Sequence, residues 1–254
     1  MPSDELRDAS TKLEWAQKDI DDVNAAIIAF ATANPYRIVK EVDPQTGEEA
    51  TIARGYGPIA TGIARAVTHA VESIWSPLDY LASALAKRQS VTDRVYFPTD
   101  ETRHEFITAK KQRDRERRFG KVAAALFNRI EPYGGGKGAF LHALRNLNNP
   151  NKHHGLMAIG TAMSGMHIRS IKVTSAGPFR VPTPDPNQSL EDGITLFIGV
   201  PEQEIEHNIG VAVNVAFRDI GIFKNEPVVP VLVQLRDGVK RVLETFDAAI
   251  FLGP

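Results

Sequence analysis

A dense polar run occupies positions 145–154, between two apolar stretches, and holds the side chains of this chain that are best suited to chemistry. Arg145 carries a permanent planar charge that fits a phosphate group. His153 and His154 titrate near neutrality and can move protons. If the arginine and a histidine converge, they can hold a phosphodiester and cleave it without a metal or other cofactor, with the 2′-hydroxyl of RNA as the internal nucleophile.

The same run also has a purely structural interpretation. Asn149-Pro150 suits the start of a new helix, so we expect one helix over 140–147 and a short second helix after it. The asparagines at 148, 149 and 151 would then satisfy backbone groups at the helix ends, while the lysine and histidines of the run lie in water. A metal site at the two histidines is disfavoured, because neighbouring helical residues point about 100° apart and no further ligand sits at a suitable spacing.

Two carboxylates are candidates for a supporting role. Glu72 and Asp79 are seven residues apart in a segment, 58–89, whose apolar spacing predicts a helix, so both lie on one helix face. They can line one pocket or pair with Arg145, and a carboxylate beside a fixed cation stays charged. They can equally be structural ion-pair partners, and both interpretations stay open.

The most basic segment of the chain, 110–121, is either a solvated helix face or a patch that contacts RNA phosphates. The chain has 30 basic and 31 acidic side chains and a net charge of −1, so no global field draws it to nucleic acid. An RNA partner would therefore be held by a local patch. The residues that we expect to form it are Lys110, Lys111, Arg113, Arg117, Arg118 and, from the polar run, Lys152.

The elements that must position these side chains can be predicted from hydrophobic spacing. Apolar residues recur every three or four positions from Leu6 to Phe30, which predicts a long helix that packs on another helix of the chain or on a second copy in a homodimer. A β-hairpin is expected over 36–53, strands near 167–173, 194–200 and 211–217, and a closing helix over 231–251. The order predicts an α+β fold: a mainly α-helical bundle with a β-hairpin insertion and a small C-terminal antiparallel sheet plus the closing helix.

Composition bounds the class of protein. We expect a helical bundle over 1–165 and a small antiparallel β region with the C-terminal helix over 166–254, or one integrated domain of both. The chain has no cysteine, which fits a reducing compartment. No apolar stretch approaches the roughly 20 residues of a membrane-spanning helix. We therefore expect a cytoplasmic protein without a membrane partner.

One short motif resembles that of a known superfamily. Leu144-Arg145-Asn146, followed by His153, resembles the Arg-Asn…His motif of the HEPN superfamily, helical-bundle proteins that include metal-independent endoribonucleases of toxin and phage-defence systems. The resemblance implies that Arg145 stabilises the phosphate, Asn146 orients or polarises, and His153 or, failing it, His154 acts as acid or base, with two protomers bringing their motifs together. Seven residues separate Arg145 from His153, a longer gap than is usual in the superfamily.

A second resemblance is to a group of uncharacterised bacterial proteins, and it implies no activity. The matching pieces are Leu78-Asp79-Tyr80, Phe97-Pro98, Glu131-Pro132-Tyr133 and Asn151-Lys152-His153. The expected function is thus a HEPN-like metal-independent endoribonuclease, or a degenerate relative that binds RNA or a nucleotide, together with a neutralising partner protein. The alternative is a non-catalytic structural or protein-interaction protein.

Overall fold

The computed structural model describes residues 2–56, 59–153, 157, 159–173, 177–183, 188–201, 205–218 and 221–252, except for the side chains of 150–153, 168, 173 and 205–209. These residues form an α+β fold, as predicted. The chain divides into two compact units. The helical unit comprises Met1–Val23, Arg65–Met157 and Val229–Pro254, and the strand unit comprises Asn24–Ala64 and Ala158–Val228.

This division differs from the sequence-based boundary at residue 165. The hairpin belongs with the later strands, and the closing helix belongs with the earlier helices. The physical reason is edge pairing: a two-stranded hairpin is marginal alone, and its second strand completes its hydrogen bonds with a strand from much later in the chain. None of the helices in the described part of the chain is long and apolar enough to cross a membrane.

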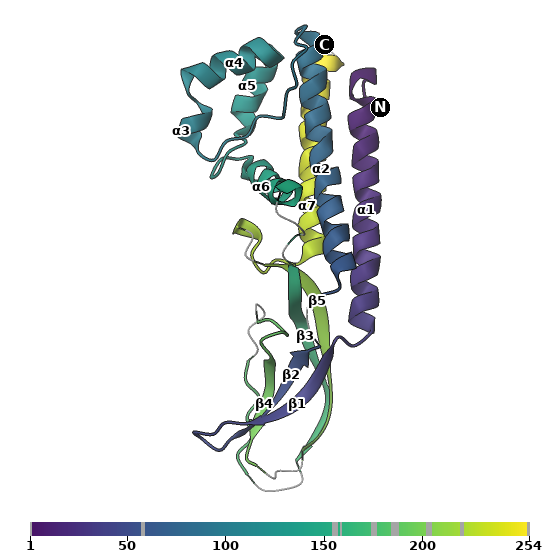
Figure 1. Cartoon of the computed structure of the whole chain (residues 1–254), viewed down its shortest axis with the longest axis vertical. Helices are drawn as coiled ribbons and strands as arrows, with labels where there is room; N and C mark the ends of the chain where they lie inside the picture. The colour runs from purple at the N-terminus through teal and green to yellow at the C-terminus, as the bar shows by residue number, and fades with distance from the viewer. Residues whose placement is uncertain are drawn as a thin grey trace. The chain divides into compact units, whose positions relative to one another are not determined.

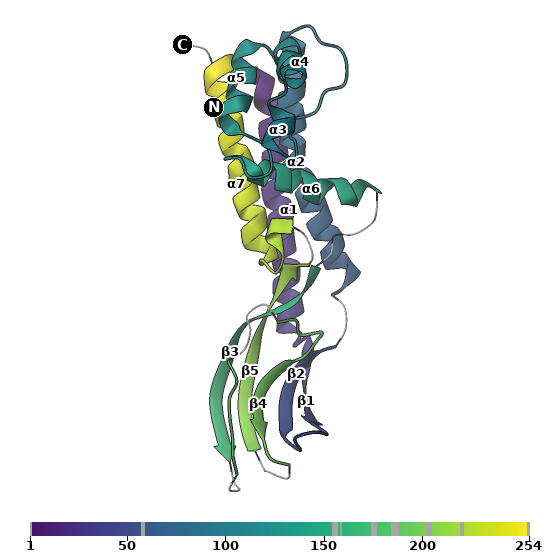
Figure 2. The same cartoon turned by 90° about the vertical axis from the view of Figure 1, so that its left-hand side faces the viewer.

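The helical unit is built on long helices that lie alongside one another, α1, α2 and α7, with the short helices α3, α4 and α5 to one side (Figures 1 and 2). The helices are α1 (Arg7–Thr32), α2 (Thr61–Arg88), α3 (Arg103–Phe106), α4 (Ala109–Phe119), α5 (Lys121–Ile130), α6 (Ala139–His153) and α7 (Val228–Phe246), with the short turns η1 (Asp4–Leu6) and η3 (Asp247–Phe251). The predicted closing helix is therefore confirmed, although its last turn is π-helical.

The seam of α1 is used inside the chain. Ala9, Ala16 and Val23 are almost completely buried. Polar contacts on either side of the seam join α1 to its neighbours: Asp19 pairs with His69 of α2 at 3.3 Å, and Gln17 accepts a hydrogen bond from Arg236 of α7. The sequence left two partners open for this seam. In the structure it packs against other helices of the same chain.

Aromatic rings fill the centre of the helical unit. The ring of Phe127 in α5 lies 5.3 Å from Phe97, 5.3 Å from Phe119 and 4.9 Å from Phe246, centroid to centroid. Edge-on and tilted contacts at these distances are favourable for aromatic pairs. One side chain thus joins the 91–102 connector, α4, α5 and α7.

Gly238 of α7 supports a close approach of α6. A Cβ atom at this position would lie 2.4 Å from Cε2 of Phe140. Alanine is a better helix former than glycine by about 1 kcal/mol, but the displaced ring would cost roughly 1–3 kcal/mol of overpacking. We expect Gly238→Ala to lower the free energy of unfolding in urea, whereas Gly62→Ala in α2, where an added Cβ meets nothing within 4 Å, should not. If Gly238→Ala leaves the free energy of unfolding unchanged or raises it, the ring of Phe140 moves aside without cost.

The strand unit contains two antiparallel sheets. One has the order β1-β2-β4, and the other pairs β3 with β5. The strands are β1 (Tyr36–Val42), β2 (Glu49–Gly55), β3 (Ile159–Val173), β4 (Ile194–Gly199) and β5 (Ile205–Phe217). The predicted hairpin and all three later strands are confirmed, but β3 and β5 begin earlier than predicted, because glycines and two register shifts in the pairing interrupt the alternation of their sequences.

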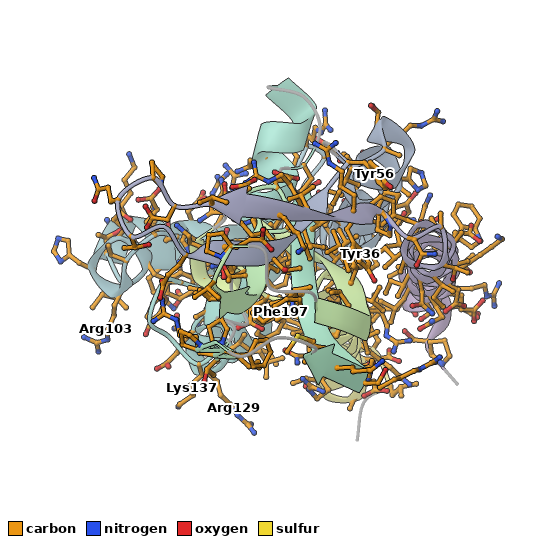
Figure 3. All side chains as sticks on the ribbon, turned by 90° about the horizontal axis from the view of Figure 1, so that it is seen from below. Tyr36, Tyr56, Arg103, Arg129, Lys137 and Phe197 are labelled. Carbon is orange, nitrogen blue, oxygen red and sulfur yellow. The ribbon has the colours of Figure 1, made fainter. Side chains whose placement is uncertain are left out.

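The two sheets of the strand unit share one hydrophobic core. Ala53 and Phe197 from the first sheet pack in the same cluster as Met163 and Val211 from the second. The backbone N–H of Val211 also donates to the hydroxyl of Tyr36, at 3.0 Å. Figure 3, which looks at the strands from below, shows Phe197 among them.

Candidate functional site

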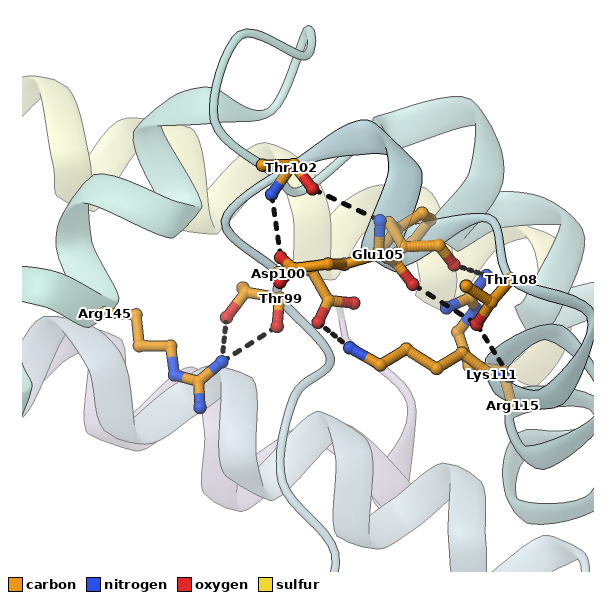
Figure 4. Close-up of polar contacts among 9 residues, drawn as sticks. Thr99, Asp100, Thr102, Glu105, Thr108, Lys111, Arg115 and Arg145 are labelled. Atoms are coloured by element: carbon orange, nitrogen blue, oxygen red, sulfur yellow. Dashed lines mark hydrogen bonds and ion pairs between the residues drawn. The ribbon is translucent and has the colours of Figure 1, made fainter.

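Two predicted site residues hold the same short segment of the connector before α3. Asp79 of α2 accepts hydrogen bonds from the backbone N–H of Phe97, at 3.2 Å, and from the indole N–H of Trp75, at 2.9 Å. Arg145 of α6 donates from Nη1 to both the carbonyl and the hydroxyl oxygen of Thr99, each at 2.8 Å (Figure 4). Asp79 and Arg145 therefore fix residues that are two apart, which is a structural role for both.

The next residues of this segment are held as firmly. The backbone N–H of Asp100 donates to the carbonyl of Pro132, and its side chain pairs with Lys111. The N–H of Gly134 donates to the carbonyl of Glu101 at 3.1 Å, an approach so close that a Cβ atom on Gly134 would lie 2.5 Å from that oxygen. A capping box between Thr102 and Glu105 then starts α3 (Figure 4). This network sets the position of the surface beside Arg145.

The predicted helix break at Asn149-Pro150 is wrong. Helix α6 continues from Ala139 to His153. Pro150 lies in the last turn, and its missing N–H removes one backbone hydrogen bond, the one that the carbonyl of Asn146 would otherwise accept. Because the helix is continuous, Arg145 and His153 are about 12 Å apart along its axis. They do not converge across a break, as the sequence led us to expect.

The other residues of the polar run are only partly defined. His154 lies outside the described residues, and so do the side chains of Lys152 and His153. Asn148, expected to cap a helix end, instead lies inside α6 with 1% of its surface exposed. Its Oδ1 atom has no hydrogen-bond partner in the described part of the chain. The capping interpretation is therefore wrong for Asn148.

A third histidine lies beside Arg145, and it was not among the residues predicted from the sequence. His142 is three residues before Arg145 and four before Asn146, so all three share one face of α6. The amide nitrogen of Asn146 is 3.2 Å from Nε2 of His142. The spacing 142, 145, 146 is visible in the sequence, but the Arg-Asn…His motif places its histidine after the arginine and so points away from it.

The basic segment forms α4, and most of its expected phosphate ligands are already paired. Besides the pair between Lys111 and Asp100, Arg117 and Arg118 both bind Asp114, at 2.8 and 2.9 Å. Burial alone would raise the pKa of Asp114, but hydrogen bonds from the two arginines outweigh this effect and hold the pKa below its usual value. These three cations are less available to RNA than predicted.

Arg115, in the middle of the same helix, is a structural residue. It is 4% exposed, donates to the carbonyl of Phe106 at 2.9 Å, and its guanidinium lies 3.8 Å from the centre of the Phe106 ring. Burial lowers the pKa of Arg115, while nearby carboxylates oppose this shift. Lys110 and Arg113 are the predicted residues of α4 that are exposed and form no ion pair with the described residues.

Further exposed cations lie on the elements that border α6. They are Arg103 at the start of α3, Arg129 near the end of α5, and Lys137 just before α6. All three project outward from one margin of the view in Figure 3. They could not be predicted as a patch, because they are scattered singly along the chain and form no basic run.

The two predicted supporting carboxylates do line one pocket. Glu72 and Asp79 both border a cavity of about 310 Å³ between α1 and α2. Within the described ranges, no group of three or more histidine, aspartate or glutamate side chains is arranged to hold a metal ion.

The chain matches no family model, no curated protein and no solved structure. The resemblance to the HEPN superfamily therefore rests on Arg145, Asn146 and His153 alone.

Proposed function

We propose that this chain is a HEPN-like, metal-independent endoribonuclease of the cytoplasm, or a degenerate relative that binds RNA or a nucleotide at the same face of α6. The observation that carries the proposal is the grouping of His142, Arg145 and Asn146 on that face. It can supply the three roles that the resemblance to the HEPN superfamily implies, with His142 in the place first given to His153.

Arg145 is suited to hold a phosphate. Its Nη1 is fixed by Thr99, while Nε and Nη2 make no hydrogen bond to any residue that the structure describes. A guanidinium that is anchored at one nitrogen loses little conformational freedom when the others bind an anion. The scissile phosphate would bind these two nitrogens.

His142 is suited to move protons. If the amide of Asn146 donates to Nε2, the neutral ring carries its proton on Nδ1 and can give it to the leaving 5′-oxygen as that bond to phosphorus breaks. The 2′-oxygen, having lost its proton to a base, forms the new bond, so the products are a 2′,3′-cyclic phosphate and a 5′-hydroxyl. His153 of a second protomer is our candidate for that base.

The electrostatic part of RNA binding would come from exposed cations that form no ion pair with the residues described by the structure. Lys110 and Arg113 of α4 and the three cations that border α6 would contact the phosphate backbone. Each such contact makes the affinity more sensitive to salt. A small number of contacts predicts weak binding to RNA, and a neutralising partner protein remains part of the proposal.

The test is cleavage of labelled single-stranded RNA and tRNA by the purified protein in EDTA. We expect wild type to cut and His142→Gln to be at least about 100-fold slower, the range typical of a lost acid–base group. The matched control is His104→Gln, which changes an exposed histidine on α3 and should keep full activity. His153→Gln, measured alongside, shows whether the second histidine acts. A folded wild type that neither cuts nor binds these RNAs contradicts the proposal.

A second candidate, a protein-interaction function without catalysis, is favoured by one observation. A groove of about 620 Å³ runs between α1 and α7 in the helical unit and is bordered by Leu6, Leu13, Leu243 and the exposed Leu252. Apolar grooves between helices are common docking sites. If this second function is the right one, substitutions at Arg145 should change only the stability of the fold, because the arginine then serves only to hold Thr99.

A further inference from the structure

The polar pocket between α1 and α2 is lined by no residue of α6 and contains chemical groups that the fold does not use. It has a volume of about 310 Å³. Helix α1 supplies Lys12, and α2 supplies the other lining residues, which are His69, Glu72, Ser73, Trp75, Ser76 and Asp79. The pocket therefore has an ammonium group on one wall and a carboxylate on the other.

The charged groups of this pocket are not satisfied by each other. Lys12 and Glu72 form no ion pair, so their charged atoms are more than 4.0 Å apart, and neither forms an ion pair with another residue that the structure describes. Lys12 instead lies 4.2 Å from the centre of the ring of Trp15. The ammonium group of Lys12 and the carboxylate of Glu72 therefore leave space between them for a ligand that carries both a negative and a positive group.

The remaining polar groups are also available. The hydroxyls of Ser73 and Ser76 make no hydrogen bond to the described residues, in contrast to Ser83 on the same helix, which donates to the carbonyl of Asp79. Nδ1 of His69 lies 3.3 Å from a carboxylate oxygen of Asp19, and Nε2 makes no hydrogen bond to the described residues, so Nε2 can accept one from a ligand. Asp79 borders the pocket too, but its oxygens already accept from Trp75 and Phe97.

We propose that this pocket binds a small α-amino acid. The carboxylate of the ligand would lie against Lys12, its ammonium group against Glu72 and the accepting Nε2 of His69, and the serine hydroxyls would complete its hydrogen bonds. The volume of about 310 Å³ is at the lower end of the range of about 300–1,000 Å³ for small-molecule sites, which suits an amino acid. This site is independent of the RNA-cleaving function proposed for α6.

The two tryptophans of the chain report on this pocket. Trp75 borders it, and Trp15 contacts Lys12. We would titrate the full chain with glycine and L-serine and follow tryptophan fluorescence, with isothermal titration calorimetry for affinity. Acetate and methylammonium, which each carry one of the two charges, are the matched ligands. We expect saturable binding of an amino acid, and we expect acetate and methylammonium each to bind at least about tenfold more weakly.

Variants then test the contacts. Lys12→Met and Glu72→Gln should each weaken amino-acid binding at least about tenfold, a change of about 1.4 kcal/mol. The control Lys18→Met removes an exposed lysine of the same helix that pairs with Asp22, and it should bind as wild type does. The proposal is overturned if neither amino acid binds wild type, if acetate or methylammonium binds as well, or if both pocket variants keep full affinity. The ligand titration of wild type decides the question even if a variant fails to fold.

Discussion

Arg145→Ala is expected to lower metal-independent RNA cleavage by about 10²–10³-fold, the loss typical when one donor to a developing negative charge is removed. The variant loses the guanidinium whose Nε and Nη2 would hold the phosphate. Arg145→Lys should recover little of the rate, because an ammonium group cannot bind Thr99 and a phosphate in the same planar geometry. The measurement is the single-turnover rate on labelled RNA in EDTA.

The structural role of Arg145 requires a control for this prediction. Removing the guanidinium leaves the carbonyl of the buried Thr99 without its partner, which costs roughly 1–3 kcal/mol of stability. Thr99→Val removes only the hydroxyl partner and keeps the carbonyl contact, so it should reduce stability slightly and preserve cleavage. If Thr99→Val slows cleavage as much as Arg145→Ala does, the arginine acts by holding the connector and does not touch the phosphate.

Phe127→Ala is expected to destabilise the helical unit by about 3–5 kcal/mol, the usual cost of deleting a buried phenylalanine ring. Its ring contacts Phe97, Phe119 and Phe246, and its side chain is completely buried. The loss is a large part of the total stability of a typical domain, roughly 5–15 kcal/mol. Urea unfolding followed by circular dichroism measures it.

The matched control is Val122→Ala on the same helix. Val122 is 58% exposed, so this substitution should change the unfolding free energy by less than about 0.5 kcal/mol. A loss of only about 1 kcal/mol for Phe127→Ala would mean that the surrounding rings collapse into the cavity and that the aromatic cluster is not the centre of the unit.

Local periodicity was sufficient for most of the secondary structure. The apolar spacing from Leu6 to Phe30 predicts α1, and the turn residues 43–47 predict the hairpin. Both signals depend on neighbours in the chain: every third or fourth side chain falls on one helix face, and Gly47 adopts a positive φ of 72° that suits the turn. The class of fold followed from the same signals.

The polar run shows where local signals mislead. Asn149-Pro150 is a strong local sign of a helix boundary, yet α6 continues through it. The packing of Leu141, Leu144 and Leu147, all buried on one side of the helix, outweighs one lost backbone hydrogen bond. Because the helix is continuous, the histidine nearest to Arg145 on the same face is His142, whereas a break would have favoured His153.

Packing in the folded chain settled the partners of several candidate residues. Charge and spacing indicated that Arg145, Asp79 and the cations of α4 were available for chemistry. Thr99, Phe97 and Asp114 engage them instead, and two of those contacts join residues 18 and 46 positions apart. Hydrogen bonds between distant parts of a chain leave no periodic trace in its sequence, because the energy of such a contact depends on distance and burial in the folded chain. The residue types therefore defined which chemistry was possible, and the fold defined which of those groups remain free to perform it.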